Sequence, residues 1–442
     1  MSLADIRHVT PSPSIERLVQ WFRENNGWLN PDVDISYSES HGFHVCATRS
    51  LSSPVIVRCP LTLTISHLNL DHSQSTVPHV NSQLQTCLGK VPKDVLTYLL
   101  LVEQRCLAKE GKSAWQPYFD CLPSPHEMTT ALWFGDDDLR YLQGTDLLPA
   151  TREKKSLLEA EYHSAVTVLA ELNVKLDSAN FAFEDYLWAF TIMSSRAFVS
   201  TYMLPNIDTF PILFPVLDIL NHSTDAKINW AFDKSCFSLE LADPTSVLPG
   251  HQIFNNYAPK QNGELLMGYG FCIPDNPIEQ FAIKMRLPPD MVEAARDMGL
   301  YNPDQVPFGL PESVVHNDQS AEQHFLRVRG HPFGRYDIDV PWLRGIPPWI
   351  VHSTFVATVM QLGHTPENTN FRKPAGILVL HVLLQIYGAI KAKSLLLPLN
   401  PHNHDTTYSN EKQKYADMYR NGQAKVLHSI LTELEAVLSN LQ

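Results

Sequence analysis

The chain has 442 residues, of which 44% are apolar and 18% charged, and its 34 basic and 47 acidic residues give a formal net charge of −13. A chain of this length is longer than a single hydrophobic core usually supports, so two or three domains are expected. The composition is that of a globular protein and excludes wholesale disorder. Nucleic-acid binders usually carry a basic excess, so we expect no direct nucleic-acid contact, whereas an acidic surface suits a basic protein partner.

Cysteine usage and apolar segments bear on the compartment. The 7 cysteines include no Cys-x-x-Cys pair, so neither a disulfide framework nor a cysteine-rich zinc site is predicted, and no metal is expected. The stretch MSLADIRHVTPSPS lacks an apolar signal core. AGILVLHVLLQIYGAI (375–390) is interrupted by His381 and Gln385, and it favours a buried helix over a membrane span. We expect a protein of the cytoplasm, the nucleus or both, neither secreted nor membrane-bound.

A small β unit is the first predicted element. Residues 41–66, HGFHVCATRSLSSPVIVRCPLTLTIS, alternate in polarity, are rich in Val, Ile and Thr, and contain the turn SLSSP. Helices follow. In 92–111, PKDVLTYLLLVEQRCLAKEG, apolar residues recur at helical spacing, with Pro92 in the first turn and Gly111 as the stop. Further helices are predicted at 154–176 and 183–198.

Strand signals return between residues 211 and 271, in the runs FPILFPVLDIL, KINWAF and SCFSLEL. The character changes again after about residue 290. Residues 303–349 are rich in Pro and Gly, and the last hundred residues hold long helical patterns. The overall expectation is a β-rich module split by a helical insert and followed by a helical C-terminal domain.

Four stretches contain residues able to do chemistry. DILNHS (218–223) ends an apolar run with two hydrogen-bonding side chains, which suits a turn or a ligand site. In HGFHVCA (41–47), the glycine is either a bend or a place where a ligand approaches the backbone. Arg196 of SSRAF ends a helix, where it meets the last carbonyls or a ligand. NNYAPKQNGELLMGYGF (255–271) holds two tyrosines, which are often core residues.

Taken in chain order, these stretches resemble SET-domain protein methyltransferases of the branch typified by the plant Rubisco large-subunit lysine methyltransferase. Fungal ribosomal-protein lysine methyltransferases belong to the same branch. The stretch WFGDDDLRYLQGT (133–145) and the final Arg- and Lys-containing helix are also similar. The likeness spans most of residues 20–280 and, more loosely, the C-terminal domain.

The resemblance implies an α+β fold, in which small sheets wrap around each other and the segment bearing NHS passes through a loop closed by a later segment. A helical insert splits this SET fold, and an all-α substrate-binding domain follows. The implied domains are the N-terminal part of the SET domain at 20–75, the insert at 76–205, the C-terminal part of the SET domain at 206–280 and the helical domain at 290–442.

The resemblance also implies an S-adenosylmethionine-dependent protein-lysine N-methyltransferase. The cysteine-rich flanks of histone-directed SET enzymes are absent, so the expected partner is a non-histone protein bearing a target lysine, such as a ribosomal protein or translation factor. The cofactor-binding residues implied are Gly42, Phe43, Asn221, His222 and Tyr269. The residues implied on the substrate side are Arg196, Phe198, Asp218 and Tyr257. Tyr269 is the implied catalytic residue, which orients the amine.

Two departures from the family pattern leave alternatives open. His41 stands where the plant enzyme has an acidic residue that helps hold the cofactor, and His44 stands where a second glycine is usual. They favour a catalytically silent protein-binding module as one alternative. Methylation of histidine is the other, although the tyrosine of YGF suits an amine channel better. We expect a monomer, and the sequence specifies neither the substrate protein nor the number of methyl groups added.

Overall fold

The structure is a computed structural model of the 442-residue chain. It describes residues 12–38, 41–73, 76–176, 181–202, 209–233, 235–281, 293, 354, 357–363, 376–397 and 408–441. The chain divides into two compact units, Met1–Met128 with Glu153–Ala258 and Thr129–Arg152 with Pro259–Gln442. The four domain boundaries implied by the resemblance stay a prediction. The division into units assigns residues 129–152 of the predicted insert to the second unit.

The described strands of the first unit form small antiparallel sheets. In the four-stranded sheet the order is β1 (Trp28–Leu29), β4 (Val55–Pro60), β8 (Cys236–Leu241) and β7 (Ile228–Phe232). A second sheet holds β2 (Val33–Ser38), β3 (Gly42–Ala47) and β9 (Gln252–Ile253), and β5 (Phe198–Val199) pairs with β6 (Pro211–Ile212). The strands predicted within 41–66, KINWAF and SCFSLEL are thus confirmed, although Leu61–Leu63 forms a 3₁₀ turn. β3 is the central strand of its sheet, which places Gly42 at the start of a strand paired on both sides.

The run FPILFPVLDIL is not a strand beyond β6, and that prediction was wrong. Residues 212–220 are all buried, as expected, but the chain turns within them and forms the 3₁₀ turn η8 (Leu217–Ile219). Val216 has φ 75°, which no strand accommodates, and Pro215 has no N–H for a ladder. A short, continuous apolar run cannot be distinguished from a buried strand by its pattern alone.

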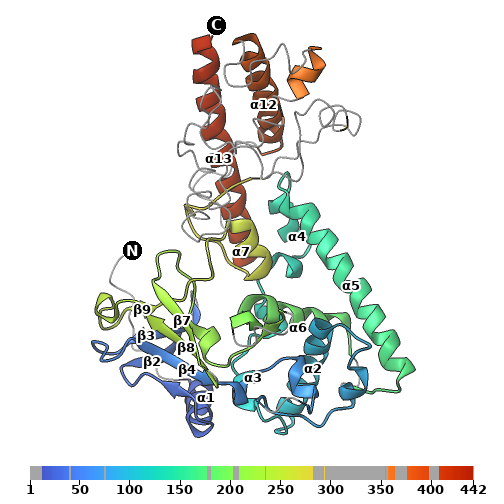
Figure 1. Ribbon diagram of the computed structural model, residues 1–442, viewed down its shortest axis with the longest axis vertical. Helices are drawn as coiled ribbons and strands as arrows, with labels where there is room; N and C mark the ends of the chain where they lie inside the picture. The colour runs from blue at the N-terminus through green and yellow to red at the C-terminus, as the bar shows by residue number, and fades with distance from the viewer. Residues whose placement is uncertain are drawn as a thin grey trace. The chain divides into compact units, whose positions relative to one another are not determined.

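The helices of the first unit are α1 (Pro13–Glu24), α2 (Lys93–Lys109), α3 (Gln116–Phe119), α6 (Phe183–Arg196) and most of α5 (Leu147–Glu171). The helices predicted at 92–111, 154–176 and 183–198 are therefore confirmed. Val95, Leu99 and Val102 are buried along one face of α2, and Gly111, with φ 73°, follows its end. Figure 1 shows the strands gathered on one side of this unit and α2, α3 and α6 on the other.

The described part of the second unit is mainly helical. Its helices include α4 (Asp136–Leu139), α7 (Asn262–Gly268), α12 (Gly376–Leu396) and α13 (Glu411–Leu441). Leu142, Leu266 of α7 and Tyr419 of α13 share one buried cluster, which joins the WFGDDDLRYLQGT stretch to the final helix. α12 confirms the predicted buried helix, because Val382 and Ile386 are fully buried. No helix among the described residues has the length and apolarity needed to cross a bilayer. Residues 303–349 lie outside the described residues.

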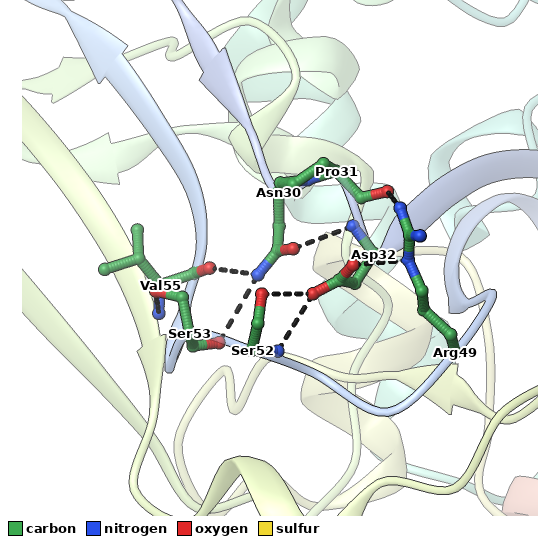
Figure 2. Close-up of polar contacts among 7 residues, drawn as sticks. All are labelled: Asn30, Pro31, Asp32, Arg49, Ser52, Ser53 and Val55. Atoms are coloured by element: carbon green, nitrogen blue, oxygen red, sulfur yellow. Dashed lines mark hydrogen bonds and ion pairs between the residues drawn. The ribbon is translucent and has the colours of Figure 1, made fainter.

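A polar network holds the loop between β3 and β4, as Figure 2 shows. Asn30 is fully buried, donates to the Val55 carbonyl at 2.8 Å and accepts from the Asp32 N–H at 2.9 Å. The Asp32 carboxylate accepts from the Ser52 N–H at 2.9 Å and from the Ser52 hydroxyl, and it pairs with Arg49 at 2.5 Å. The hydrogen bonds from Ser52 lower the pKa of Asp32, so this carboxylate stays ionised and fixes the loop that links the two larger sheets.

Candidate active site

The backbone at Gly42 requires glycine. Its φ is 62°, and a Cβ added there would meet no atom of the described residues within 4 Å, so this part of the structure leaves open space beside the start of β3. Phe43, the next residue, is half-buried and meets the Tyr37 ring edge-on, with centroids 5.2 Å apart. The Gly-Phe turn therefore presents backbone to a free space and is steadied by an aromatic contact from β2.

The segments bearing NHS and NNY lie side by side. His222 and Asn255 form a parallel bridge. The Asn255 N–H donates to the Asn221 carbonyl at 2.8 Å, and the Ser223 N–H donates to the Asn255 carbonyl at 2.9 Å. Asn255 is almost fully buried, and its side-chain oxygen accepts from the Trp230 indole N–H at 3.0 Å. The two motifs are thus joined through the backbone, with Asn255 as the central residue.

The Asn221 side chain connects this ladder to the first motif. Its amide donates to the His41 carbonyl at 3.0 Å, 180 residues away in the chain. The peptide that precedes Gly42 is therefore held directly against the Asn-His pair. The structure brings together HGF, NHS and NNY as the resemblance implied, and it does so through contacts that no local sequence pattern encodes.

Tyr257 packs on His222. The ring centroids are 5.0 Å apart at an interplanar angle of 18°, and the Tyr257 N–H donates to His222 Nδ1 at 3.0 Å. A ring nitrogen that accepts a hydrogen bond carries no proton, so His222 is neutral here, with its proton on Nε2. The Tyr257 hydroxyl donates to the Leu220 carbonyl at 2.8 Å. Tyr257 thus contacts the residues on both sides of Asn221, the carbonyl of Leu220 and the side chain of His222.

Arg196 and Asp218 form a buried ion pair. Arg196, the last residue of α6, donates to the Asp218 carboxylate at 3.2 Å and to the Asp218 carbonyl at 3.3 Å. The Asp218 side chain is 0% exposed and that of Arg196 is 22% exposed. Burial raises the pKa of Asp218, and the neighbouring Arg196 and Tyr118 oppose that rise. Asp218 is thus paired within the first unit, and its place on the substrate side stays a prediction.

Sequence reasoning missed Tyr118. This tyrosine, in the four-residue helix α3, donates its hydroxyl to Asp218 Oδ2 at 2.7 Å. It is 2% exposed and lies 100 positions before its partner. No spacing or motif in QPYF points to this contact, which depends on how α3 packs in the first unit.

Phe198 lies in an aromatic cluster. It is 6% exposed, and its ring meets those of Phe214, Trp230 and Phe237 edge-on at 5.8, 5.0 and 5.0 Å. Phe198 is therefore a core residue of the first unit, and its place on the substrate side stays a prediction.

Tyr269 belongs to the second unit, where it follows the end of α7. Burial raises its pKa, and the Lys260 ammonium lies 5.8 Å from the centre of its ring. The adjacent Gly270 has φ 83°, and a Cβ there would lie 2.6 Å from the Thr129 hydroxyl oxygen. The glycine of the YGF motif is thus required both by backbone conformation and by close packing. The catalytic role of Tyr269 stays a prediction.

The two histidines that depart from the family pattern flank Gly42. His44 Nδ1 lies 2.9 Å from the Gly42 carbonyl and donates to it, and the His41 and His44 ring centroids are 5.9 Å apart. Burial lowers the pKa of His44. The His44 ring therefore folds back onto its own strand as a neutral group.

The chain matches no protein-family model. The ribosomal lysine N-methyltransferase set10 of Schizosaccharomyces pombe is 26% identical over 425 residues, which cover 95% of this chain and 72% of that protein. The actin-histidine N-methyltransferase of Rhinolophus ferrumequinum is 25% identical over 278 residues, or 61% of this chain and 44% of that protein.

Among solved structures, Rubisco LSMT bound to sinefungin and monomethyllysine aligns with a TM-score of 0.66 at 20% identity, covering 98% of this chain and 94% of that one. The fold is therefore that of Rubisco LSMT. In sequence, over nearly the whole chain, and in the convergence of HGF, NHS and NNY, the chain is therefore similar to the Rubisco large-subunit methyltransferase-like branch of SET-domain protein lysine methyltransferases.

Proposed function

We propose that the protein is an S-adenosylmethionine-dependent protein-lysine N-methyltransferase acting on a non-histone protein. The observation that carries this proposal is the joining of HGF, NHS and NNY around Asn221, whose side chain binds the His41 carbonyl while its backbone pairs with Asn255. The similarity to set10, which is named a ribosomal lysine N-methyltransferase, favours a ribosomal protein as the substrate.

The cofactor has a suitable place beside β3. The open space at Gly42 would let a ligand approach the backbone, Phe43 follows Gly42 in β3, and the Asn221 side chain binds the His41 carbonyl just before it. His222 is the next residue after Asn221 and bridges to Asn255. A neutral His222 adds no charge that would repel a sulfonium. S-adenosylmethionine, when bound, supplies the methyl group as an electrophile. We assign these residues to the cofactor together with Tyr269 of the second unit.

Methyl transfer needs alignment more than acid–base catalysis. The lysine amine must first lose a proton, because its free pKa is about 10.4. Desolvation beside aromatic walls favours the neutral amine, whose lone pair forms the N–C bond as the C–S bond breaks and sulfur keeps the electron pair. We assign Tyr257, Arg196, Phe198 and Asp218 to this side of the site, and Tyr269 to orientation of the amine.

Methylation of a histidine is the second candidate, and the likeness to an actin-histidine N-methyltransferase favours it. A catalytically silent protein-binding module is the third, supported by His41 and His44 beside Gly42. We also propose that the protein acts as a monomer in the cytoplasm or nucleus, with a protein as its partner and no direct nucleic-acid or membrane contact.

One experiment separates these candidates. Wild-type, Tyr257→Phe and Tyr269→Phe proteins are incubated with radiolabelled S-adenosylmethionine and lysate from a strain lacking the gene. Label in one or few bands, reduced in both variants, supports the proposal, and mass spectrometry then identifies lysine or histidine as the modified residue. A folded wild-type protein that transfers no label and binds no S-adenosylhomocysteine in calorimetry contradicts the proposal and supports the silent module.

A further inference from the structure

Tyr118 contacts Asp218 from outside the motifs that carry the resemblance. Its hydroxyl donates to Asp218 Oδ2 at 2.7 Å, and both side chains are buried. We propose that Tyr118 is a positioning residue of the methyltransferase site, which keeps Asp218 ionised and paired with Arg196 and thereby holds the turn that carries Asn221. This inference rests on the proposed function.

The turn that Tyr118 secures lies directly before the Asn-His pair. Asp218 is in η8, and Leu220 and Asn221 follow without a break. Arg196 donates hydrogen bonds to both the carboxylate and the carbonyl of Asp218, and Tyr118 donates to the same carboxylate. A shift of this carboxylate therefore moves a backbone that lies three residues from Asn221.

The carboxylate has few alternatives to Tyr118. Its Oδ2 accepts from Tyr118 and Arg196, while its buried Oδ1 has no hydrogen-bond partner in the described part of the chain. The bond from Tyr118 is the shorter of the two, at 2.7 Å against 3.2 Å. A buried carboxylate that loses one of two donors favours its protonated form. Asp218 would then be left with Arg196 alone.

The titratable groups around Asp218 come from several elements. Arg196 and the Tyr118 hydroxyl hydrogen-bond to it, and buried thiols and a phenol lie within electrostatic range of Asp218 or of Arg196. These further groups are Cys59 of β4, Cys121 after α3 and Tyr257. Burial raises the pKa values of the Cys59 and Cys121 thiols, so both stay neutral through the working range. Among these groups, protonation of Asp218 is therefore the change that would reduce the rate on the acidic limb of the pH–rate profile.

The matched test is Tyr118→Phe against Tyr186→Phe. Tyr186 is fully buried in the first unit and donates to Glu161 at 2.8 Å, so both variants lose one phenol–carboxylate hydrogen bond and no ring. Label transfer from S-adenosylmethionine into the lysate band is measured against pH. We expect the acidic limb of the Tyr118→Phe profile to move up by about one pH unit, which is about a tenfold loss of rate on that limb. The acidic limb of the Tyr186→Phe profile should coincide with that of the wild type.

A double-mutant cycle shows whether Tyr118 acts through Asp218. If it does, at a pH on the acidic limb, adding Tyr118→Phe to the Asp218→Asn protein changes the residual rate by less than about threefold, although it costs about tenfold in the wild type at that pH. Equal losses in both backgrounds would overturn the proposal, and so would a folded Tyr118→Phe protein whose acidic limb is unmoved.

Thermal unfolding tests the coupling without activity. The bond from Tyr118 favours ionised Asp218, so the loss of melting temperature caused by Tyr118→Phe should grow as pH rises through the folded pKa of Asp218. A loss independent of pH would contradict the coupling. A wild-type protein that transfers no label would refute the proposed function, while this thermal measurement would still decide whether Tyr118 holds Asp218 ionised.

Discussion

Tyr257 and His222 form one stacked and hydrogen-bonded unit, with ring centroids 5.0 Å apart and the Tyr257 N–H 3.0 Å from His222 Nδ1. The same tyrosine reaches past His222 with its hydroxyl to the Leu220 carbonyl at 2.8 Å. The residue proposed for the lysine channel is thus tied to the peptide proposed for the cofactor. A change at Tyr257 should therefore affect both stability and rate.

Tyr257→Phe keeps the stacked ring and the backbone bond and removes only the hydroxyl. We expect the free energy of unfolding to fall by about 1 kcal/mol, as for one lost hydrogen bond, and label transfer to fall about tenfold. Urea unfolding and the labelling assay measure the two effects. Retention of full activity with the expected loss of stability would remove Tyr257 from the lysine channel.

Gly42→Ala places a methyl group in the space proposed for the cofactor. The backbone cost of a non-glycine residue at φ 62° is about 1–2 kcal/mol. Gly89→Ala is the matched control, because Gly89 has φ 74° and its added Cβ would also meet no described atom within 4 Å. We expect similar losses of stability, with a loss of S-adenosylhomocysteine affinity of about tenfold or more only in Gly42→Ala. Equal affinities in calorimetry would place the cofactor elsewhere.

Asp32→Asn tests the network of Figure 2. Because the folded pKa of Asp32 is lowered, its contribution to stability is present above the unfolded pKa of about 3.9 and is lost as pH falls through the folded pKa. The difference in unfolding free energy between wild type and variant should therefore be largest near neutral pH and shrink towards pH ~2. Urea titrations at several pH values measure it, and a constant difference would show that ionisation is irrelevant there.

Two non-glycine residues with positive φ differ in burial and should respond oppositely to glycine. Ala258 has φ 77° and is exposed, so Ala258→Gly relieves about 1–2 kcal/mol of backbone strain against about 0.4–1 kcal/mol of added unfolded-state entropy. The net expectation is a slight gain in stability. Val216 has φ 75° and is 0% exposed, so Val216→Gly also removes a buried side chain and should destabilise by about 1 kcal/mol or more. Denaturant midpoints compare the pair.

Local physics made much of the fold predictable. α2 and α6 follow from helical spacing of apolar residues, and β3, β7 and β8 follow from alternation with β-branched and aromatic residues. The exception is FPILFPVLDIL, where Val216 adopts a conformation that no propensity favours. A buried segment can be either a strand or a turn, and in the folded structure this one packs as a turn.

The sequence by itself determined which residue types stand at the ends of β3, the NHS run and α6. These are the glycine of HGF, the Asn-His pair after an apolar run and the arginine of SSRAF. Only the tertiary structure decided their partners. Asn221 meets His41 across 180 positions, and Tyr118 meets Asp218 across 100. Propensity and patterning act within a few residues of the chain, whereas such contacts arise from the burial of whole faces against one another, so no local pattern encodes them.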